Sequence, residues 1–152
     1  MANAETATEL QREVRIAADA ETVFEFFTDP EKATLWMGTS AEMDPQPGGV
    51  YRVNVMGEHM ARGEYVAVEP PSRVAFTWGW EDEDASVRPG ASTVEVTLEP
   101  DGDGTLVRLV HRNLPDEESR QRHGMGWDHY LSRLMIAAAG GDAGPDRGPQ
   151  PE

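Results

Sequence analysis

Alternating hydrophobic and polar residues mark several β-strands along the chain. The first strand is expected at residues 10–16, where apolar side chains recur on one parity. Similar alternation predicts the following strands at about residues 51–55, 60–68, 73–80, 93–98 and 105–112. Turn-forming residues separate them, most clearly the proline and glycine clusters at 69–72 and 100–104. Short connections of this kind favour an antiparallel meander.

Helical signals flank these strands. Asp19 is a suitable N-cap for a short helix from about residue 20. Asp29-Pro30 has the order of an N-cap and a first helical residue, which predicts a second short helix to about residue 37. A long helix is expected from Asp116 to the glycines at 140–141, with acidic residues in its first turn. Its apolar stripe has spacings of four, three and four residues and consists of Trp127, Leu131, Leu134 and Ala138.

These elements predict how the chain is organised. An antiparallel sheet with one apolar face needs a cover, and the long terminal helix is the only predicted element of sufficient length. We therefore expect an α+β fold in which a curved antiparallel sheet wraps around this helix and leaves a cavity between them. One domain is expected over residues 10–139. Residues 1–9 are expected to be flexible and residues 140–152 disordered, because neither end has apolar periodicity.

Length and charge exclude several classes of protein. The 152 residues correspond to one domain, and 13 Lys and Arg against 28 Asp and Glu give a net charge of −15. Nucleic acid and anionic membranes are therefore not expected partners. The chain has no cysteine, which excludes disulfides, thiolate nucleophiles and Cys-ligated metals. No signal peptide or membrane span is recognisable, so we expect a cytoplasmic protein, and the Ala-, Gly- and Arg-rich composition with almost no Lys is typical of a high-GC bacterium.

Candidate catalytic groups are few. His123 and His129 are six residues apart and do not share a helix face, and His59 lies far away, so no metal site is expected. The acidic run at residues 81–84 is expected to be a solvated loop, with a gate over the pocket or a cation contact as the lesser alternative. No phosphate-binding loop or hydrolase triad is present, and no cofactor is expected. His111, on the inward parity of the last strand, is a weak candidate for proton transfer or ligand contact, and a structural histidine bonded to a backbone carbonyl is the favoured interpretation.

Several motifs resemble those of the Activator of Hsp90 ATPase homologue 1-like family, in the family's order. They are Thr28-Asp29-Pro30-Glu31 with Trp36, Pro47-Gly48-Gly49-Val50-Tyr51, Gly63 with Glu69-Pro70-Pro71-Ser72-Arg73, Phe76-Thr77-Trp78, His111, and Gly126-Trp127 with Leu131 and Leu134. The resemblance extends from about residue 14 to residue 138. It implies the helix-grip fold of the START/Bet v 1-like (SRPBCC) superfamily, with a deep and mostly apolar pocket. It does not imply one activity, because that superfamily includes lipid carriers, polyketide cyclases and aromatases, co-chaperone domains and antibiotic-sequestering proteins.

The residues expected to line the pocket lie on predicted inward faces or at its rim. They are Trp36, Tyr51, Arg52, Val53, Val55, Phe76, Trp78, Trp80, His111, Trp127, Tyr130, Leu131 and Leu134. The aromatic rings could stack on a planar ligand or simply fill the core, and the sequence leaves both interpretations open. His111 and Arg52 are the candidates for polar contacts with a ligand.

The leading hypothesis is non-catalytic binding of a hydrophobic small molecule, whose specific form is sequestration of a natural product, as in antibiotic self-resistance. The enzyme alternative is a polyketide cyclase or aromatase in which His111 assists proton transfer. A co-chaperone of an Hsp90-like ATPase ranks third, because the resemblance covers one domain without the additional N-terminal domain of full activators. The sequence leaves the ligand and the choice between monomer and homodimer open.

Overall fold

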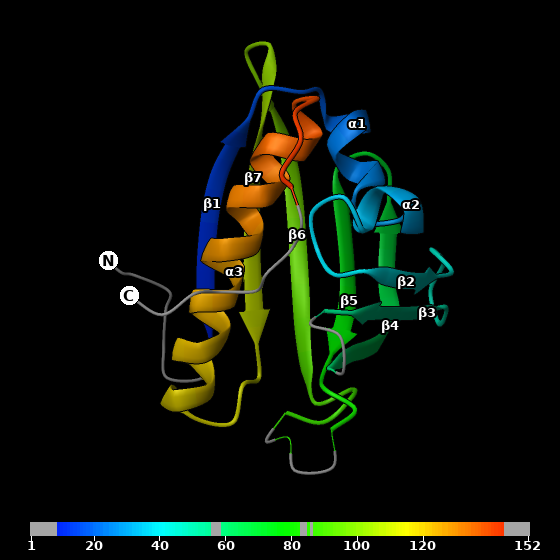
Figure 1. Ribbon diagram of the computed structural model, residues 1–152, viewed down its shortest axis with the longest axis vertical. Coiled ribbons are helices and arrows are strands. Elements are labelled where there is room, and N and C mark those ends of the chain that lie inside the picture. Colours follow the sequence, from blue (N-terminus) through cyan, green and yellow to red (C-terminus); the bar gives the residue numbers. More distant parts are fainter. Residues whose placement is uncertain (1–8, 56–58, 83–84, 86, 145–152) are drawn as a thin grey trace.

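The computed structural model describes residues 9–55, 59–82, 85 and 87–144. Within these residues, seven antiparallel strands form one sheet in the order β1-β7-β6-β5-β4-β3-β2 (Figure 1). The strands are β1 (Leu10–Ile16), β2 (Ser40–Met43), β3 (Val50–Asn54), β4 (Met60–Glu69), β5 (Arg73–Trp78), β6 (Ser92–Asp101) and β7 (Gly104–Arg112). The helices are α1 (Ala20–Glu25), α2 (Pro30–Ala33) and α3 (Glu117–Ala138).

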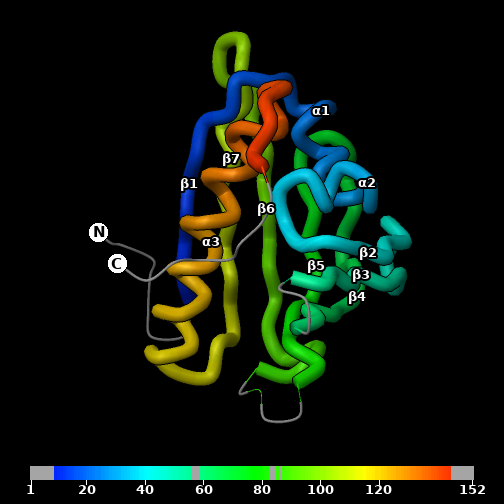
Figure 2. Tube along the Cα trace, in the orientation of Figure 1, coloured from blue at the N-terminus to red at the C-terminus, as the bar shows by residue number. Residues whose placement is uncertain are grey.

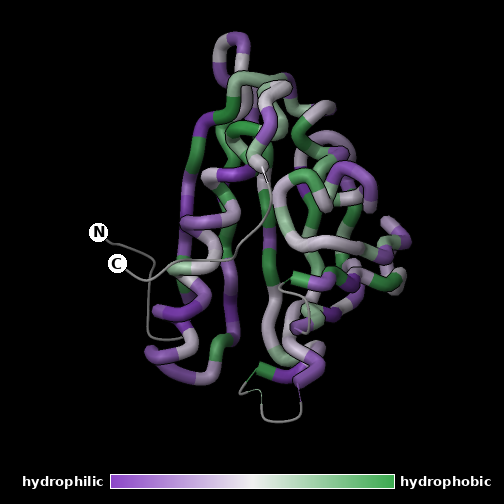
Figure 3. Tube along the Cα trace, in the orientation of Figure 1, coloured by the Kyte–Doolittle hydropathy of each residue, from purple (hydrophilic) through white to green (hydrophobic). Residues whose placement is uncertain are grey.

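The helices cover one face of this sheet. The long α3 lies along β1 and β7 (Figure 1). The short α1 and α2 lie on the same face, toward the edge of the sheet opposite to β1 (Figures 1 and 2). Hydrophobic and hydrophilic residues alternate along strands such as β6 (Figure 3), as a sheet with one buried face requires. The architecture is the helix-grip α+β fold, which confirms the expected fold class.

Each helix begins where the sequence predicts, at an aspartate cap. The side chains of Asp19, Asp29 and Asp116 accept hydrogen bonds from backbone N–H groups two or three residues ahead. The prediction for the end of α2 was wrong: the helix stops at Ala33 rather than near residue 37. The chain continues as hydrogen-bonded turns to Gly38, whose φ of 78° is left-handed and turns the backbone toward β2.

The predicted strands are confirmed, and one strand was missed. The sequence Ser-Ala-Glu-Met of β2 contains no β-branched residue, so its propensity gives no strand signal. It becomes a strand because it pairs with β3, with Ala41 opposite Val53. The predicted strand ending at Trp80 instead stops at Trp78, and Trp80 forms an isolated bridge with Ala61 beyond Gly79.

The expected disordered tail begins with an anchored segment. The buried guanidinium of Arg133 donates hydrogen bonds to the carbonyl oxygens of Ala143 and Gly144 at 3.0 and 2.9 Å, and to that of Trp36 at 2.8 Å. Residues 1–8 and 145–152, on which most of the predicted flexible ends fall, lie outside the described residues. In the part of the chain that is described, no helix is long and apolar enough to cross a membrane.

Candidate functional site

A cavity of about 590 Å³ lies between the first half of α3 and the end of the sheet where β5 finishes. Its walls come from α3, from Trp78 in β5, from described residues between β5 and β6, and from Val55 after β3 and His59 before β4. This volume falls in the range that small-molecule sites usually occupy. The cavity is therefore the natural candidate for the functional site.

Aromatic side chains form the deep wall of the cavity. Trp78 and Trp127 are buried, and their ring centroids are 5.3 Å apart. Trp80 meets Trp78 edge to face at 5.5 Å, and Tyr130 adds a fourth ring from the next turn of α3. The indole Nε1 of Trp78 has no hydrogen-bond partner among the described residues. Three of the four tryptophans in the chain thus meet around one cavity.

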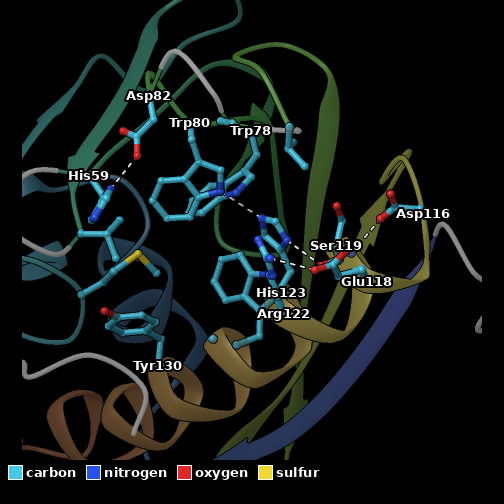
Figure 4. A pocket seen from close by; sticks show the side chains of 16 residues that line it. His59, Trp78, Trp80, Asp82, Asp116, Glu118, Ser119, Arg122, His123 and Tyr130 are labelled. Atoms are coloured by element: carbon cyan, nitrogen blue, oxygen red, sulfur yellow. Dashed lines mark hydrogen bonds and ion pairs between the residues drawn. The ribbon is translucent and has the colours of Figure 1, made fainter. Parts of the chain in front are cut away.

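One of these indoles fixes the protonation of His123. The Nε1 of Trp80 can only donate, and it lies 3.1 Å from Nε2 of His123, which must therefore accept. Nδ1 of His123 then carries the proton and donates it to the carbonyl oxygen of Ser119 at 2.8 Å (Figure 4). Burial lowers the pKa of the His123 imidazole below its ordinary value, although the bond to Ser119 opposes the shift. His123 is thus a neutral residue with both ring nitrogens occupied.

His111 lies behind the aromatic wall in a second chain of hydrogen bonds. The Nε1 of Trp127 donates to Nδ1 of His111 at 3.0 Å, so the proton of a neutral His111 sits on Nε2. Nε2 donates to Ser92 Oγ at 2.8 Å, and this hydroxyl donates to the carbonyl oxygen of Trp78 at 2.7 Å. Burial lowers the pKa of His111 well below 6.5, and nearby His123 adds to the shift. Every polar atom of the imidazole is therefore committed to the fold.

Polar groups gather at two sides of the cavity. On one side His59 Nδ1 lies 2.6 Å from Asp82 Oδ2, and on the other Asp116, Glu118 and Ser119 lie around the start of α3, with the indoles between them (Figure 4). Arg122 donates to Glu118 at 2.8 Å in an exposed pair. Within the described residues, no three His, Asp or Glu side chains are arranged to hold a metal ion.

The model of one protein family, described as Activator of Hsp90 ATPase homolog 1-like protein, matches residues 17–139. This chain belongs to that family. The match runs from the residue after β1 through α3 and confirms the resemblance seen in the sequence motifs. Comparison with curated proteins gave no significant match.

Several solved structures share the fold of this chain. An AHSA1-like protein from Rhizobium etli is 46% identical, with 93% of this chain and 88% of that chain aligned and a TM-score of 0.73. CalU16 from Micromonospora echinospora is 27% identical over 88% of this chain and 78% of that chain, with a TM-score of 0.69. DynU16, described as a protein in the dynemicin biosynthetic locus, is 24% identical over 93% of this chain and 51% of that chain, with a TM-score of 0.76, and shows the fold alone.

The structure divides the residues that were expected to line the pocket of this family member. Five of them line the cavity: Val55, Trp78, Trp80, Trp127 and Tyr130. Seven others lie elsewhere in the interior, namely Trp36, Tyr51, Val53, Phe76, His111, Leu131 and Leu134. Arg52 pairs with Glu81 through two hydrogen bonds of 2.8 and 3.1 Å. Contact of any of these residues with a ligand stays a prediction.

Several polar residues at the cavity were not among the predicted site residues. Asp82 was assigned to a solvated acidic run, yet it lines the cavity, close to where the backbone N–H of Trp80 donates to the carbonyl oxygen of Val87 at 2.8 Å. His123 was set aside as a scattered histidine. Its spacing of four residues from both Ser119 and Trp127 could have placed it on the inner face of α3.

Proposed function

We propose that this protein binds a hydrophobic small molecule in the cavity between the sheet and α3. The observation that supports this best is the aromatic wall, in which Trp78, Trp80, Trp127 and Tyr130 border one drug-sized space. A protein that used these rings only as core would be expected to close the space around them, because interiors pack nearly as densely as organic crystals. Burial of apolar ligand surface supplies about 25 cal/mol per Å² toward binding.

Sequestration of a natural product is the specific form of binding that we favour. DynU16, which has the same fold, is described as a protein in the dynemicin biosynthetic locus. A binding role without catalysis fits His111 and His123, since a lone pair that already accepts an indole N–H is not available to take a proton from a ligand. The binding partner proposed here is therefore a hydrophobic small molecule that is bound and released without chemical change.

The test is to fill the cavity from a position where the fold tolerates a side chain. Gly126 lines the cavity on α3, and a Cβ there would meet no atom within 4 Å. Gly126→Leu therefore projects a branched side chain into the space, whereas Gly126→Ala leaves most of it open. Gln121→Leu, on an exposed face of the same helix, adds leucine outside the cavity and is the matched control.

Ligands are titrated against intrinsic tryptophan fluorescence, using fatty acids, aromatic polyketides and enediyne-type natural products. We expect at least one class to quench saturably, with affinity kept in Gly126→Ala and Gln121→Leu and reduced about tenfold or more in Gly126→Leu, which is about 1.4 kcal/mol. Unchanged affinity in Gly126→Leu would place any bound ligand elsewhere. A complete lack of response to every class would contradict the proposal.

An enzymatic role has one specific observation in its favour. His59 Nδ1 contacts the Asp82 carboxylate at 2.6 Å beside the cavity, which is the arrangement of an oriented general base. The proton-transfer candidate of a cyclase or aromatase is therefore His59 rather than His111. In this alternative, wild-type protein converts a polyketide substrate and His59→Gln does not, while both bind it.

A co-chaperone role predicts stimulation of a bacterial Hsp90 ATPase at micromolar protein.

A further inference from the structure

We infer that the cavity selects planar aromatic cations over ligands that carry a carboxylate. This inference rests on the proposed function and specifies the chemical class of the ligand. It is drawn from the π faces and the charges that border the same cavity.

The aromatic wall offers π faces in several orientations. The planes of Trp78 and Trp80 are 85° apart and those of Trp78 and Trp127 are 48° apart, so the three indoles form an angled surface and not one flat stack. The face of an indole carries negative potential and attracts a cation more strongly than any other side-chain ring. A planar ligand can stack on one ring while its charged group approaches another.

Formal charges around the cavity have the same sign as the indole faces. Three carboxylates border it, those of Asp82, Asp116 and Glu118, against the single guanidinium of Arg122. The hydrogen bond from the Ser119 N–H lowers the pKa of Asp116, which keeps that carboxylate ionised at neutral pH. A cation that enters the cavity is attracted by this surplus, and an anion is repelled.

The basic groups at the cavity are already engaged with other partners. Arg122 is paired with Glu118 and His59 with Asp82. His123 is held neutral because Nε2 accepts from Trp80, so protonating it to receive a carboxylate would cost that hydrogen bond. Among the described lining residues, a carboxylate ligand therefore finds no cation that is without an acidic partner.

The start of α3 does not supply the missing positive charge. A helix N-terminus attracts anions through its unpaired N–H groups and its dipole. Here Asp116 already accepts the N–H of Ser119 at 2.9 Å, and Glu117 and Glu118 stand in the same turn. Asp116 therefore occupies the N–H group that an anionic ligand would take, and Asp116 and Glu118 present negative charge to the cavity.

Three probes of the same tricyclic shape test this charge preference. They are 9-aminoacridinium with charge +1, acridone with charge 0 and acridine-9-carboxylate with charge −1, each followed by its own fluorescence as protein is added. At low salt we expect 9-aminoacridinium to bind about tenfold more tightly than acridine-9-carboxylate, with acridone between them. The preference is expected to shrink as salt is raised, because counterions screen exposed charges.

Variants separate the charges at the cavity from the charge of the whole protein. Asp116→Asn with Glu118→Gln removes two negative charges at the cavity, and Asn is still a good helix cap. Glu21→Gln with Glu99→Gln changes the net charge equally, at exposed positions that do not line the cavity. We expect the first pair to bring the affinities for the cation and the anion to within about threefold and the second pair to leave the preference unchanged.

Two results would overturn the charge preference while leaving the proposed function intact. One is equal or tighter binding of acridine-9-carboxylate or acridone, and the other is failure of all three acridines in a protein that binds a fatty acid or another ligand class. If both variant pairs reduced the preference for the cation equally, the net charge of the protein would explain that preference. The inference that the carboxylates at the cavity cause it would then be wrong. Failure of every ligand in both experiments contradicts the proposed function as well.

Discussion

The indole nitrogen of Trp127 donates a 3.0 Å hydrogen bond to Nδ1 of His111, and both side chains are buried. This bond joins α3 to β7 at the back of the cavity. Through Ser92 it continues to the backbone of Trp78, so one chain of donors and acceptors connects the helix, β7, β6 and β5. His111 therefore acts first as a polar connection between the two layers of the fold.

Replacing His111 with leucine is expected to lower the free energy of unfolding by about 2–4 kcal/mol, because the buried Trp127 N–H then has no acceptor. Trp127→Phe breaks the same bond from the other side. Urea denaturation of both single variants and the double variant measures the coupling, which we expect to be about 1–2 kcal/mol. Strictly additive losses would mean that the hydrogen bond contributes nothing to stability.

Acidification should destabilise the protein in a defined window. Burial lowers the pKa values of His111 and His123, so the unfolded chain binds protons below pH 6.5 that the folded chain does not. Stability from these groups is present above the unfolded pKa and is lost as the pH falls. Between pH 7 and 5.5 the free energy of unfolding should drop by about 2 kcal/mol, at up to about 1.4 kcal/mol per pH unit for each histidine.

His123→Gln serves as the control for this pH effect. This variant removes one of the two histidines whose pKa is lowered. About half of the decrease in the free energy of unfolding between pH 7 and 5.5 should disappear with it. The lowered pKa values of Glu81 and Asp116 place their titration below this window. Equal stability of the wild-type protein at pH 7 and pH 5.5, measured by chemical denaturation, would contradict the prediction.

Most of the fold could be predicted from local signals, and the site only in part. Aspartate caps and alternating strands are encoded within a few residues, so the helix starts and six strands were found without tertiary information. The strand β2 and the end of α2 depend on partners elsewhere in the chain. Periodicity shows that a residue points inward, but it does not show whether that residue lies in the dense core or at the cavity. Tyr51, which stacks on Phe76 at 3.9 Å, lies in the core, whereas Trp78 lines the cavity.

Two glycines are expected to differ sharply in their tolerance of alanine. A Cβ at Gly63 would lie 1.8 Å from the backbone oxygen of Thr77, where β4 passes β5, so Gly63→Ala forces the strands apart. Gly90 has a φ of 86° but open space around it, and alanine there costs only the backbone strain of about 1 kcal/mol. We expect Gly63→Ala to lose at least about 3 kcal/mol or to be insoluble, measured by urea denaturation. Similar stability of the two variants would refute the steric argument.

Arg133 is predicted to hold the chain after α3 against the rest of the domain. The residue is 8% exposed, and its guanidinium donates to the carbonyl oxygens of Trp36, Ala143 and Gly144. Arg133→Met removes these donors and leaves the buried Trp36 carbonyl without this donor, so we expect a loss of about 1–3 kcal/mol and faster proteolysis after residue 139. The control Arg108→Met breaks an exposed pair with Glu13 and should cost less than about 1 kcal/mol.

The comparison of Arg133 with lysine separates geometry from charge. A lysine keeps the positive charge but brings one ammonium group in place of a planar fork, and it cannot reach carbonyls on both sides of the guanidinium at once. Arg133→Lys should therefore resemble Arg133→Met in limited proteolysis of the segment after α3, while retaining part of the stability. If Arg133→Lys protects that segment from proteolysis as well as the wild-type protein does, the positive charge alone is sufficient to hold it. The hydrogen bonds of the planar guanidinium to the carbonyl oxygens of Ala143 and Gly144 would then not be required.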